Sequence, residues 1–130
     1  MRRFNVPSLG KPSPFYCHAA KAGGLLSIAG MLGDGDEFEE QCESAYGRVL
    51  QVLQHEGLGW QHVLQFTTYL TRAEDVAAFN AWRVARYGQM FPEGACPPNT
   101  MLLVSALAGE GRRIELQALA VDETGAAAAR

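Results

Sequence analysis

Glu115 is the acidic side chain whose neighbours in the sequence most favour a chemical role. It stands between Ile114 and Leu116 in an apolar run. Successive residues of a β-strand point to opposite faces of a sheet, so we expect its carboxylate to face away from its apolar neighbours. Carboxylates act as general acids or bases where a cleft holds them beside a substrate. The simpler alternative is a strand glutamate that faces solvent.

Cys17 and His18 are a second pair of potentially catalytic residue types. A thiol beside an imidazole suggests an activated thiolate. Neighbours in a strand point to opposite faces, however, so we expect this pair to make a poor catalytic dyad. Cys42 is expected in the core, and Cys96 is a loop thiol with nothing to distinguish it.

The residue types that bind metals are too scattered to predict a metal centre. His55 and His62 lie seven residues apart, and no third ligand follows at the spacing of a metal site. The three cysteines include no Cys-x-x-Cys pair, which argues against a zinc site and a disulfide framework and favours a reducing compartment. We therefore expect no metal, no cofactor and a cytoplasmic location.

The composition indicates one ordinary globular domain. The chain has 130 residues, of which 48% are hydrophobic and 19% charged, enough to bury a core without disulfides. Its net charge is −3 and its 11 basic residues are scattered, so the basic patch of a nucleic-acid binder is missing. No apolar run approaches the roughly 18 residues of a membrane span, and the first residues lack a secretory signal. Nucleic acids and membranes are not expected as partners.

Apolar spacing predicts two helices and several strands that would position these residues. Residues 37–57 repeat apolar side chains at intervals of three and four, as one face of a helix does. Thr71 and Glu74 have the spacing of a capping box, which predicts a second helix that ends at Gly88 or Pro92. Strands are predicted at residues 15–20, 25–29, 63–70, 100–107 and 113–121.

This order of elements indicates an α+β fold with both helices on one face of a mixed sheet. The first two strands would form a hairpin, and residues 109–111 would join the last two. Residues 100–104 are apolar at nearly every position, so we expect this strand to be buried on both faces, with a second subunit as one cover. Residues 1–123 form the predicted domain, and residues 124–130 a flexible tail.

Several segments resemble the RidA (YjgF) family, and they occur in the family's order. In residues 15–30 the family has a proline, tyrosine, serine and histidine before an alanine-rich turn, two glycines and an apolar strand that ends in Ser-Gly. Similar segments follow at residues 67–70, 74–80 and 114–121, so the resemblance covers about residues 4–122.

The resemblance implies a RidA/chorismate-mutase-like fold with a sheet of about six strands and two helices. It also implies a homotrimer with one small-molecule cleft at each subunit interface. The family reaction is the hydrolysis of reactive enamines and imines such as 2-aminoacrylate, in which water adds to the C=N carbon and ammonia leaves. The expected partners are a small-molecule metabolite and further copies of the chain.

The resemblance also implies roles for individual residues. Glu115 matches the family's glutamate that orients the hydrolytic water, and Tyr16 matches the tyrosine that lines the cleft. Gly30 and Met31 lie where backbone amides approach the ligand, and Cys17 replaces the usual serine. The alternatives are that Tyr16 is an ordinary strand tyrosine and that Gly30 only permits a turn.

Asn99 departs from the family pattern. RidA enzymes have Pro-Ala-Arg-Ser, with an arginine that binds the substrate carboxylate, where this chain has Pro97-Pro98-Asn99-Thr100. An asparagine amide is neutral and suits a carbonyl, amide or hydroxyl rather than a carboxylate. Asn99 and Thr100 are therefore expected in the binding site with altered chemistry, and Arg112 or Arg113 could supply the missing cation.

Three functions remain open. The first is a hydrolase or deaminase-like enzyme whose substrate lacks an α-carboxylate or is bound by another cation. The second is a non-catalytic trimer that binds a metabolite. The third is an endoribonuclease, which the missing basic patch argues against.

Overall fold

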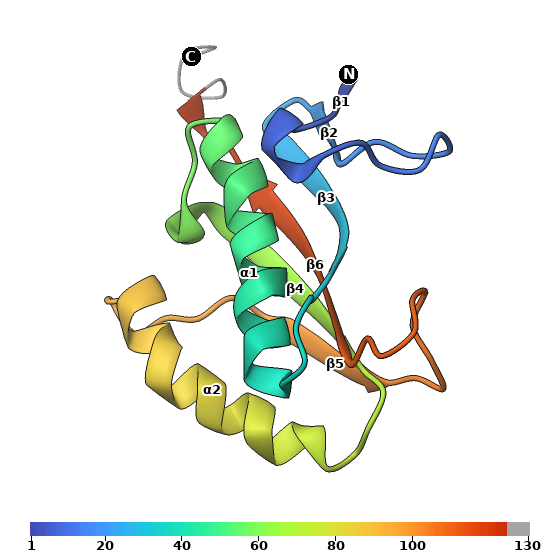
Figure 1. Cartoon of the computed structure of the whole chain (residues 1–130). Coiled ribbons are helices and arrows are strands. Elements are labelled where there is room, and N and C mark those ends of the chain that lie inside the picture. Colours follow the sequence, from blue (N-terminus) through green and yellow to red (C-terminus); the bar gives the residue numbers. More distant parts are fainter. Residues whose placement is uncertain (125–130) are drawn as a thin grey trace.

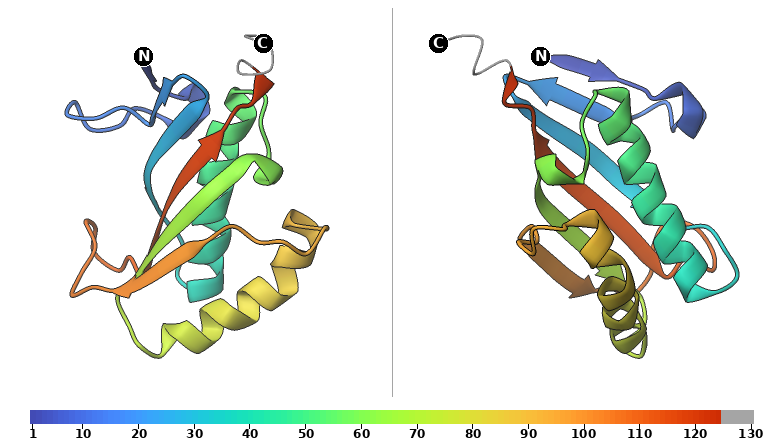
Figure 2. Two further views of the ribbon diagram at one scale, coloured as in Figure 1. Left: turned by 180° about the vertical axis from the view of Figure 1, so that it is seen from behind. Right: turned by 90° about the vertical axis from the view of Figure 1, so that its left-hand side faces the viewer.

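Two helices cover one face of a six-stranded sheet in the computed structural model, which describes residues 1–124 (Figure 1). The strand order is β1-β2-β3-β6-β4-β5, and only β4 and β5 are parallel. This arrangement, seen from two further sides in Figure 2, confirms the predicted α+β class and mixed sheet. The strands are β1 (Arg2–Phe4), β2 (Ala19–Ala22), β3 (Leu25–Leu32), β4 (Val63–Leu70), β5 (Asn99–Leu103) and β6 (Ile114–Val121). The two α-helices are α1 (Phe38–His55) and α2 (Asp75–Met90), and the two short 3-10 helices are η1 (Pro7–Leu9) and η2 (Trp60–His62).

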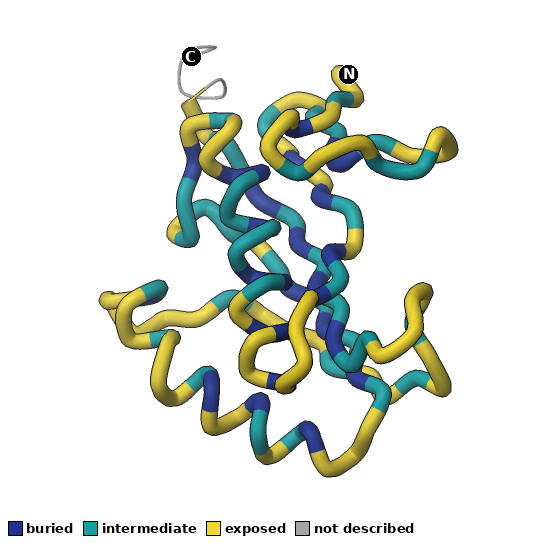
Figure 3. The backbone as a smooth tube through the Cα atoms, in the orientation of Figure 1, coloured by how far each residue is buried: buried dark blue, intermediate teal, exposed yellow. Residues whose placement is uncertain are grey.

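The core lies between α1 and the central strands, where buried residues are concentrated (Figure 3). The predicted first helix is confirmed, and a capping box between Glu37 and Glu40 fixes its start. Its apolar residues recur every three or four positions and face β3 and β6. Cys42 is fully buried as expected, and this burial raises the pKa of its thiol to about 12. No helix in the part of the chain described here is both long and apolar enough to cross a bilayer.

The second helix exists where predicted, but its predicted start was wrong. α2 begins at Asp75, and no side chain caps its first turn. The Thr71 backbone N–H instead donates to the Arg113 carbonyl oxygen, 3.3 Å away, so Thr71 belongs to the end of the sheet. The helix ends at Met90, shortly before Pro92.

The first hairpin is shorter than predicted. β2 begins at Ala19 rather than at residue 15, and Tyr16 and Cys17 lie in the loop before it. Pro12 and Pro14, just before residue 15, lack the N–H that a strand ladder needs, so the chain up to residue 14 stays outside the sheet. The chain end also holds the loop, because the Asn5 side chain accepts from the His18 backbone N–H at 3.0 Å.

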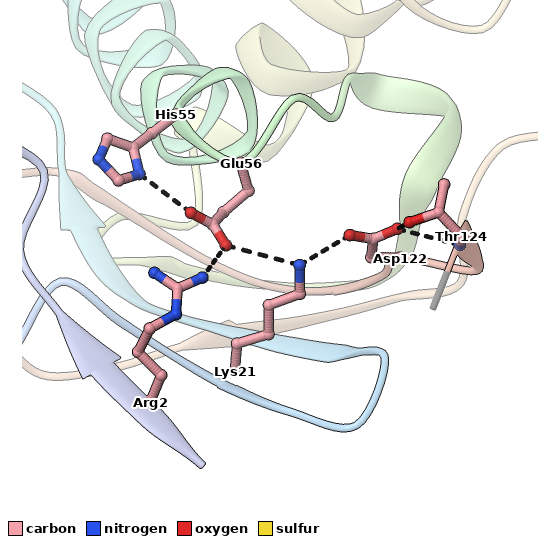
Figure 4. Close-up of polar contacts among 6 residues, drawn as sticks. All are labelled: Arg2, Lys21, His55, Glu56, Asp122 and Thr124. Carbon is pink, nitrogen blue, oxygen red and sulfur yellow. Dashed lines mark hydrogen bonds and ion pairs between the residues drawn. The ribbon is translucent and has the colours of Figure 1, made fainter. Parts of the chain in front are cut away.

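An unpredicted strand, β1, forms one edge of the sheet. It pairs with β2, and a network of charged side chains links it to the end of α1 and the end of β6 (Figure 4). Arg2 binds Glu56, while Lys21 Nζ lies 3.5 Å from Glu56 and 2.7 Å from Asp122. A strand of three residues carries too little pattern to be found in a sequence.

The last two strands are not neighbours, which the sequence analysis did not predict. β5 ends at Leu103 rather than residue 107, and it pairs with β4 at the edge of the sheet. β6 begins at Ile114 and lies between β3 and β4. In the single chain Leu102 is 41% and Leu103 55% exposed, so the burial of residues 100–104 on both faces, with a second subunit as one cover, stays a prediction.

Candidate functional site

A cavity of about 520 Å³ opens beside the second half of β3. β2 pairs only with residues 25–28 of β3. Among the described strands, only β6 pairs with the end of β3. The cavity walls come from the loop of residues 10–18, from β3, from Arg48 on α1 and from Glu115 on β6. The structure thus brings Tyr16, Gly30, Met31 and Glu115 together, four of the residues selected from the sequence.

Glu115 points away from the core, as the alternation predicted. Its neighbours Ile114 and Leu116 are fully buried on the helix side, whereas Glu115 is half-buried on the other side. Burial raises the pKa of the Glu115 carboxyl above its usual range. No side chain within residues 1–124 forms an ion pair or hydrogen bond with this carboxylate. A carboxylate that is partly desolvated and unpaired can accept a proton at a higher pH than a solvated one.

Gly30 leaves the space that the Glu115 side chain occupies. A Cβ atom at this position would lie 2.9 Å from Glu115 Cδ and 2.9 Å from Oε1, closer than real Cβ contacts. β3 also has a bulge here, between Ile28 and Met31. The absence of a Cβ at Gly30 therefore leaves room for the Glu115 carboxylate in its observed position, in addition to permitting the bulge.

Tyr16 and Met31 line the same cavity from different depths. Tyr16 is 55% exposed and lies in the loop, so the alternative of an ordinary strand tyrosine is wrong. Met31 is buried and pairs with Leu116 of β6. The cavity is therefore lined by a buried apolar side chain, Met31, and by the exposed aromatic ring of Tyr16.

Cys17 lies outside this cavity. It lines a neighbouring hollow of about 340 Å³ with Tyr16, and its side chain forms no hydrogen bond with His18 among the bonds of the described chain. The two residues precede β2, so their expected placement in a strand was also wrong. The thiol and imidazole do not form a dyad.

His18 lines the Glu115 cavity, although the sequence analysis treated it only as a partner of Cys17. It is buried, with 6% of its surface exposed. Its Nδ1 accepts a hydrogen bond from the Val6 backbone N–H at 3.0 Å. Its carbonyl oxygen accepts from the Ala29 N–H at 2.9 Å. Nothing in the sequence near His18 signals these long-range contacts.

Asn99 and Thr100 lie elsewhere in the single chain. They begin β5, where Asn99 Oδ1 accepts a hydrogen bond from the Thr68 hydroxyl at 2.8 Å. Tyr69 of β4 pairs with Glu115 of β6 on one side and with Leu102 of β5 on the other. Asn99 is three residues before Leu102, so it lies two strands away from Glu115 and three residues along the strand. Strand spacing and rise place the two residues roughly 14 Å apart. Neither Asn99 nor Thr100 lines the Glu115 cavity of its own chain.

Arg112 and Arg113, the two arginines proposed as substitute cations, bind other groups of the chain. Arg113 binds Asp75 with two hydrogen bonds, one of them from Nε at 2.9 Å, and this carboxylate raises the pKa of the guanidinium. Arg112 donates to the Gly33 carbonyl at 3.1 Å and pairs with Asp34. Neither lines the Glu115 cavity.

The cations that do line the cavity are Lys11 and Arg48, which the sequence analysis did not select. Arg48 donates to the Leu32 carbonyl oxygen at 2.7 Å and pairs with Asp34. The residues described here contain no group of three or more His, Cys, Asp or Glu side chains that could hold a metal ion.

Comparison with known proteins places the chain in a family. The family model described as endoribonuclease L-PSP matches residues 10–122. A RutC family protein of Synechocystis is 32% identical over 108 residues, which are 74% of this chain and 79% of the relative.

Solved structures share the fold. A YjgF-family protein of Neisseria meningitidis is 27% identical and has a TM-score of 0.77, with 93% of each chain covered. TdcF of E. coli, solved with bound serine, is 17% identical and also has a TM-score of 0.77, with 92% of this chain and 94% of that chain covered. The chain therefore belongs to the endoribonuclease L-PSP family, the YjgF/RidA family that its sequence resembles.

Proposed function

We propose that this protein is a Rid-type hydrolase that acts on the C=N bond of a small imine or enamine. The observation that carries the proposal is the unpaired carboxylate of Glu115, which lies in a cavity of about 520 Å³ against Gly30. A cavity of this size suits a metabolite rather than a macromolecule.

The reaction requires a group that takes a proton from water. Water adds to the carbon of a protonated C=N bond, and the proton that it loses passes to a base such as Glu115. The resulting carbinolamine then releases ammonia and leaves a carbonyl group. Burial raises the pKa of Glu115, and a base with a pKa nearer to the working pH is more effective than an ordinary carboxylate.

The relatives support a small-molecule cleft. TdcF of E. coli was solved with bound serine, a small amino acid, and it shares the fold over most of this chain. By this likeness we propose that the cavity is the metabolite site, lined by Tyr16, Gly30, Met31 and Glu115.

Asn99 determines the kind of substrate that we propose. An arginine would hold a carboxylate with two charge-assisted bonds, which the neutral amide of Asn99 cannot form. We therefore propose a substrate with a neutral carbonyl, amide or hydroxyl in place of the α-carboxylate. Because Asn99 and Thr100 do not line the Glu115 cavity of their own chain, we propose that they reach the cavity of another copy across a subunit interface, in a homotrimer.

The experiment is a measurement of ammonia release from two substrates generated in solution, 2-aminoacrylate and its neutral amide. We expect the protein to accelerate hydrolysis of the amide and to act only feebly on the acid. The variant Asn99→Arg should raise turnover of the acid. No acceleration of either substrate over the spontaneous rate would contradict the proposal.

A non-catalytic, metabolite-binding trimer is the second candidate. The replacement of the family arginine by Asn99 favours it, because the chain has lost one group of the family's reaction site. In that case ligands would bind at the cavity and ammonia release would stay at the spontaneous rate. The ribonuclease activity in the family's name is not favoured by the net charge of −3.

A further inference from the structure

His18 is a polar group in the Glu115 cavity to which the proposed reaction gives no role. It lines the cavity although only 6% of its surface is exposed. Three contacts fix it. Its Nδ1 accepts from the Val6 N–H at 3.0 Å, its N–H donates to Asn5 Oδ1 at 3.0 Å, and its carbonyl accepts from the Ala29 N–H at 2.9 Å.

The bond from Val6 determines the tautomer of the ring. A backbone N–H can only donate, so Nδ1 must be unprotonated to accept it. The neutral ring then carries its hydrogen on Nε2. Protonation of Nδ1 would break the bond from Val6, and burial lowers the pKa of the imidazole as well. The ring is therefore held as a neutral donor at pH 7.

The other ring nitrogen, Nε2, is available to a ligand. Nε2 forms no hydrogen bond with any described residue, whereas no fully buried side-chain nitrogen or oxygen of residues 1–124 lacks a partner. Nε2 is therefore accessible to solvent, and the cavity is the hollow that His18 lines. A nearly buried donor that lacks a protein partner is suited to a ligand oxygen.

We propose that the Nε2–H of His18 donates a hydrogen bond to a neutral carbonyl oxygen of the substrate. This names the substrate class more closely, as amides and ketones rather than carboxylates, and it rests on the proposed function only in taking the same cavity as the substrate site. The neutral ring adds no positive charge to the cavity, and the Glu115 carboxylate repels an anionic ligand there. Of the two cations that line the cavity, Arg48 is already paired with Asp34 and Lys11 is exposed to solvent.

The first test is nitrogen-15 NMR of the histidine rings in the native protein at pH 7. We expect His18 to be neutral with its hydrogen on Nε2. Titration with lactamide, a small neutral amide, should then shift the His18 Nε2 resonance, and lactate, the matching carboxylate, should bind more weakly. A hydrogen on Nδ1, a cationic ring, or no lactamide binding would overturn the inference. So would lactamide binding that leaves the His18 resonances unchanged.

Two variants separate a binding role from a structural one. His18→Gln keeps an acceptor for Val6 and a donor for the ligand, so its lactamide affinity should be close to native. His18→Phe keeps a ring of similar size without the donor, so affinity should fall about tenfold, the value of one neutral hydrogen bond. Equal affinity of His18→Phe and native protein would overturn the inference. A loss of hydrolysis with these binding results intact would count against the proposed function instead.

Discussion

At the scale of residues, the position of Glu115 depends on Gly30. Alternation along the strand was enough to predict which face of the sheet Glu115 occupies. The sequence could not show that its carboxylate lies against the backbone of another strand, because that contact depends on how β3 and β6 pair and on the bulge after Ile28.

Replacement of Gly30 by alanine should separate the catalytic geometry from the fold. The new methyl group would lie 2.9 Å from Glu115 Cδ and would displace the carboxylate. A shift of about 1 Å in a catalytic group can cost about a hundredfold in rate, so we expect kcat to fall by about that factor. The matched control is Gly47→Ala on α1, where nothing lies within 4 Å of the added atom. Normal turnover by Gly30→Ala would mean that the carboxylate position does not matter.

His18 should make the stability of the protein depend on pH. Burial lowers the pKa of its ring below the ordinary value of 6.5, so the unfolded chain binds the proton more readily than the folded one. The free energy of unfolding should therefore decrease as pH falls below about 6.5 and should be independent of this group above it. Urea unfolding at several pH values should show a smaller decrease for His18→Gln. Parallel pH profiles for the two proteins would contradict the lowered pKa.

At the scale of elements, long periodic segments were predictable and their junctions were not. The strand at residues 63–70 and the helix that follows Glu37 are confirmed, because each has a pattern longer than one turn or pleat. The predicted start of α2 was wrong. The helix begins at Asp75, whose side chain binds Arg113, thirty-eight residues later, and no local sequence pattern reveals such a long-range contact. The neighbours of β5 and β6 were likewise set by tertiary pairing.

The ion pair of Asp75 and Arg113 should be the strongest polar tie between α2 and the sheet. The Asp75 side chain is 3% exposed and the Arg113 side chain 21%. Asp75→Asn would leave a partly buried guanidinium without its partner, which should lower the free energy of unfolding by about 3 kcal/mol. The control is Arg86→Gln, whose pair with Glu43 is exposed and should contribute less than about 1 kcal/mol. Similar losses in the two variants by urea unfolding would refute this ranking.

At the scale of the whole molecule, β5 is an unprotected edge. It lies at the end of the sheet, with Leu102 41% and Leu103 55% exposed. Natural proteins usually cover or charge such an edge. The apolar sequence of residues 100–104 predicted that it needs a cover, and nothing within residues 1–124 covers Leu102 and Leu103 fully.

We expect the chain to associate as a trimer in solution. Association would cover β5 and would let Asn99 reach the Glu115 cavity of another copy, because it does not line the cavity of its own chain. Light scattering at micromolar concentration should give three times the chain mass of 14.1 kDa. A monomer would contradict the proposed interface cleft and would leave Asn99 and Thr100 without a role in binding.

The most direct test of the hydrolase is the variant Glu115→Gln, assayed for ammonia release from the neutral amide of 2-aminoacrylate and for lactamide binding. Glutamine keeps the shape of the side chain but cannot take a proton from water. We expect kcat to fall at least about a hundredfold, as for the loss of a general base, while lactamide affinity and stability change little. Normal turnover by a folded variant would contradict the role of Glu115 and with it the proposed hydrolase.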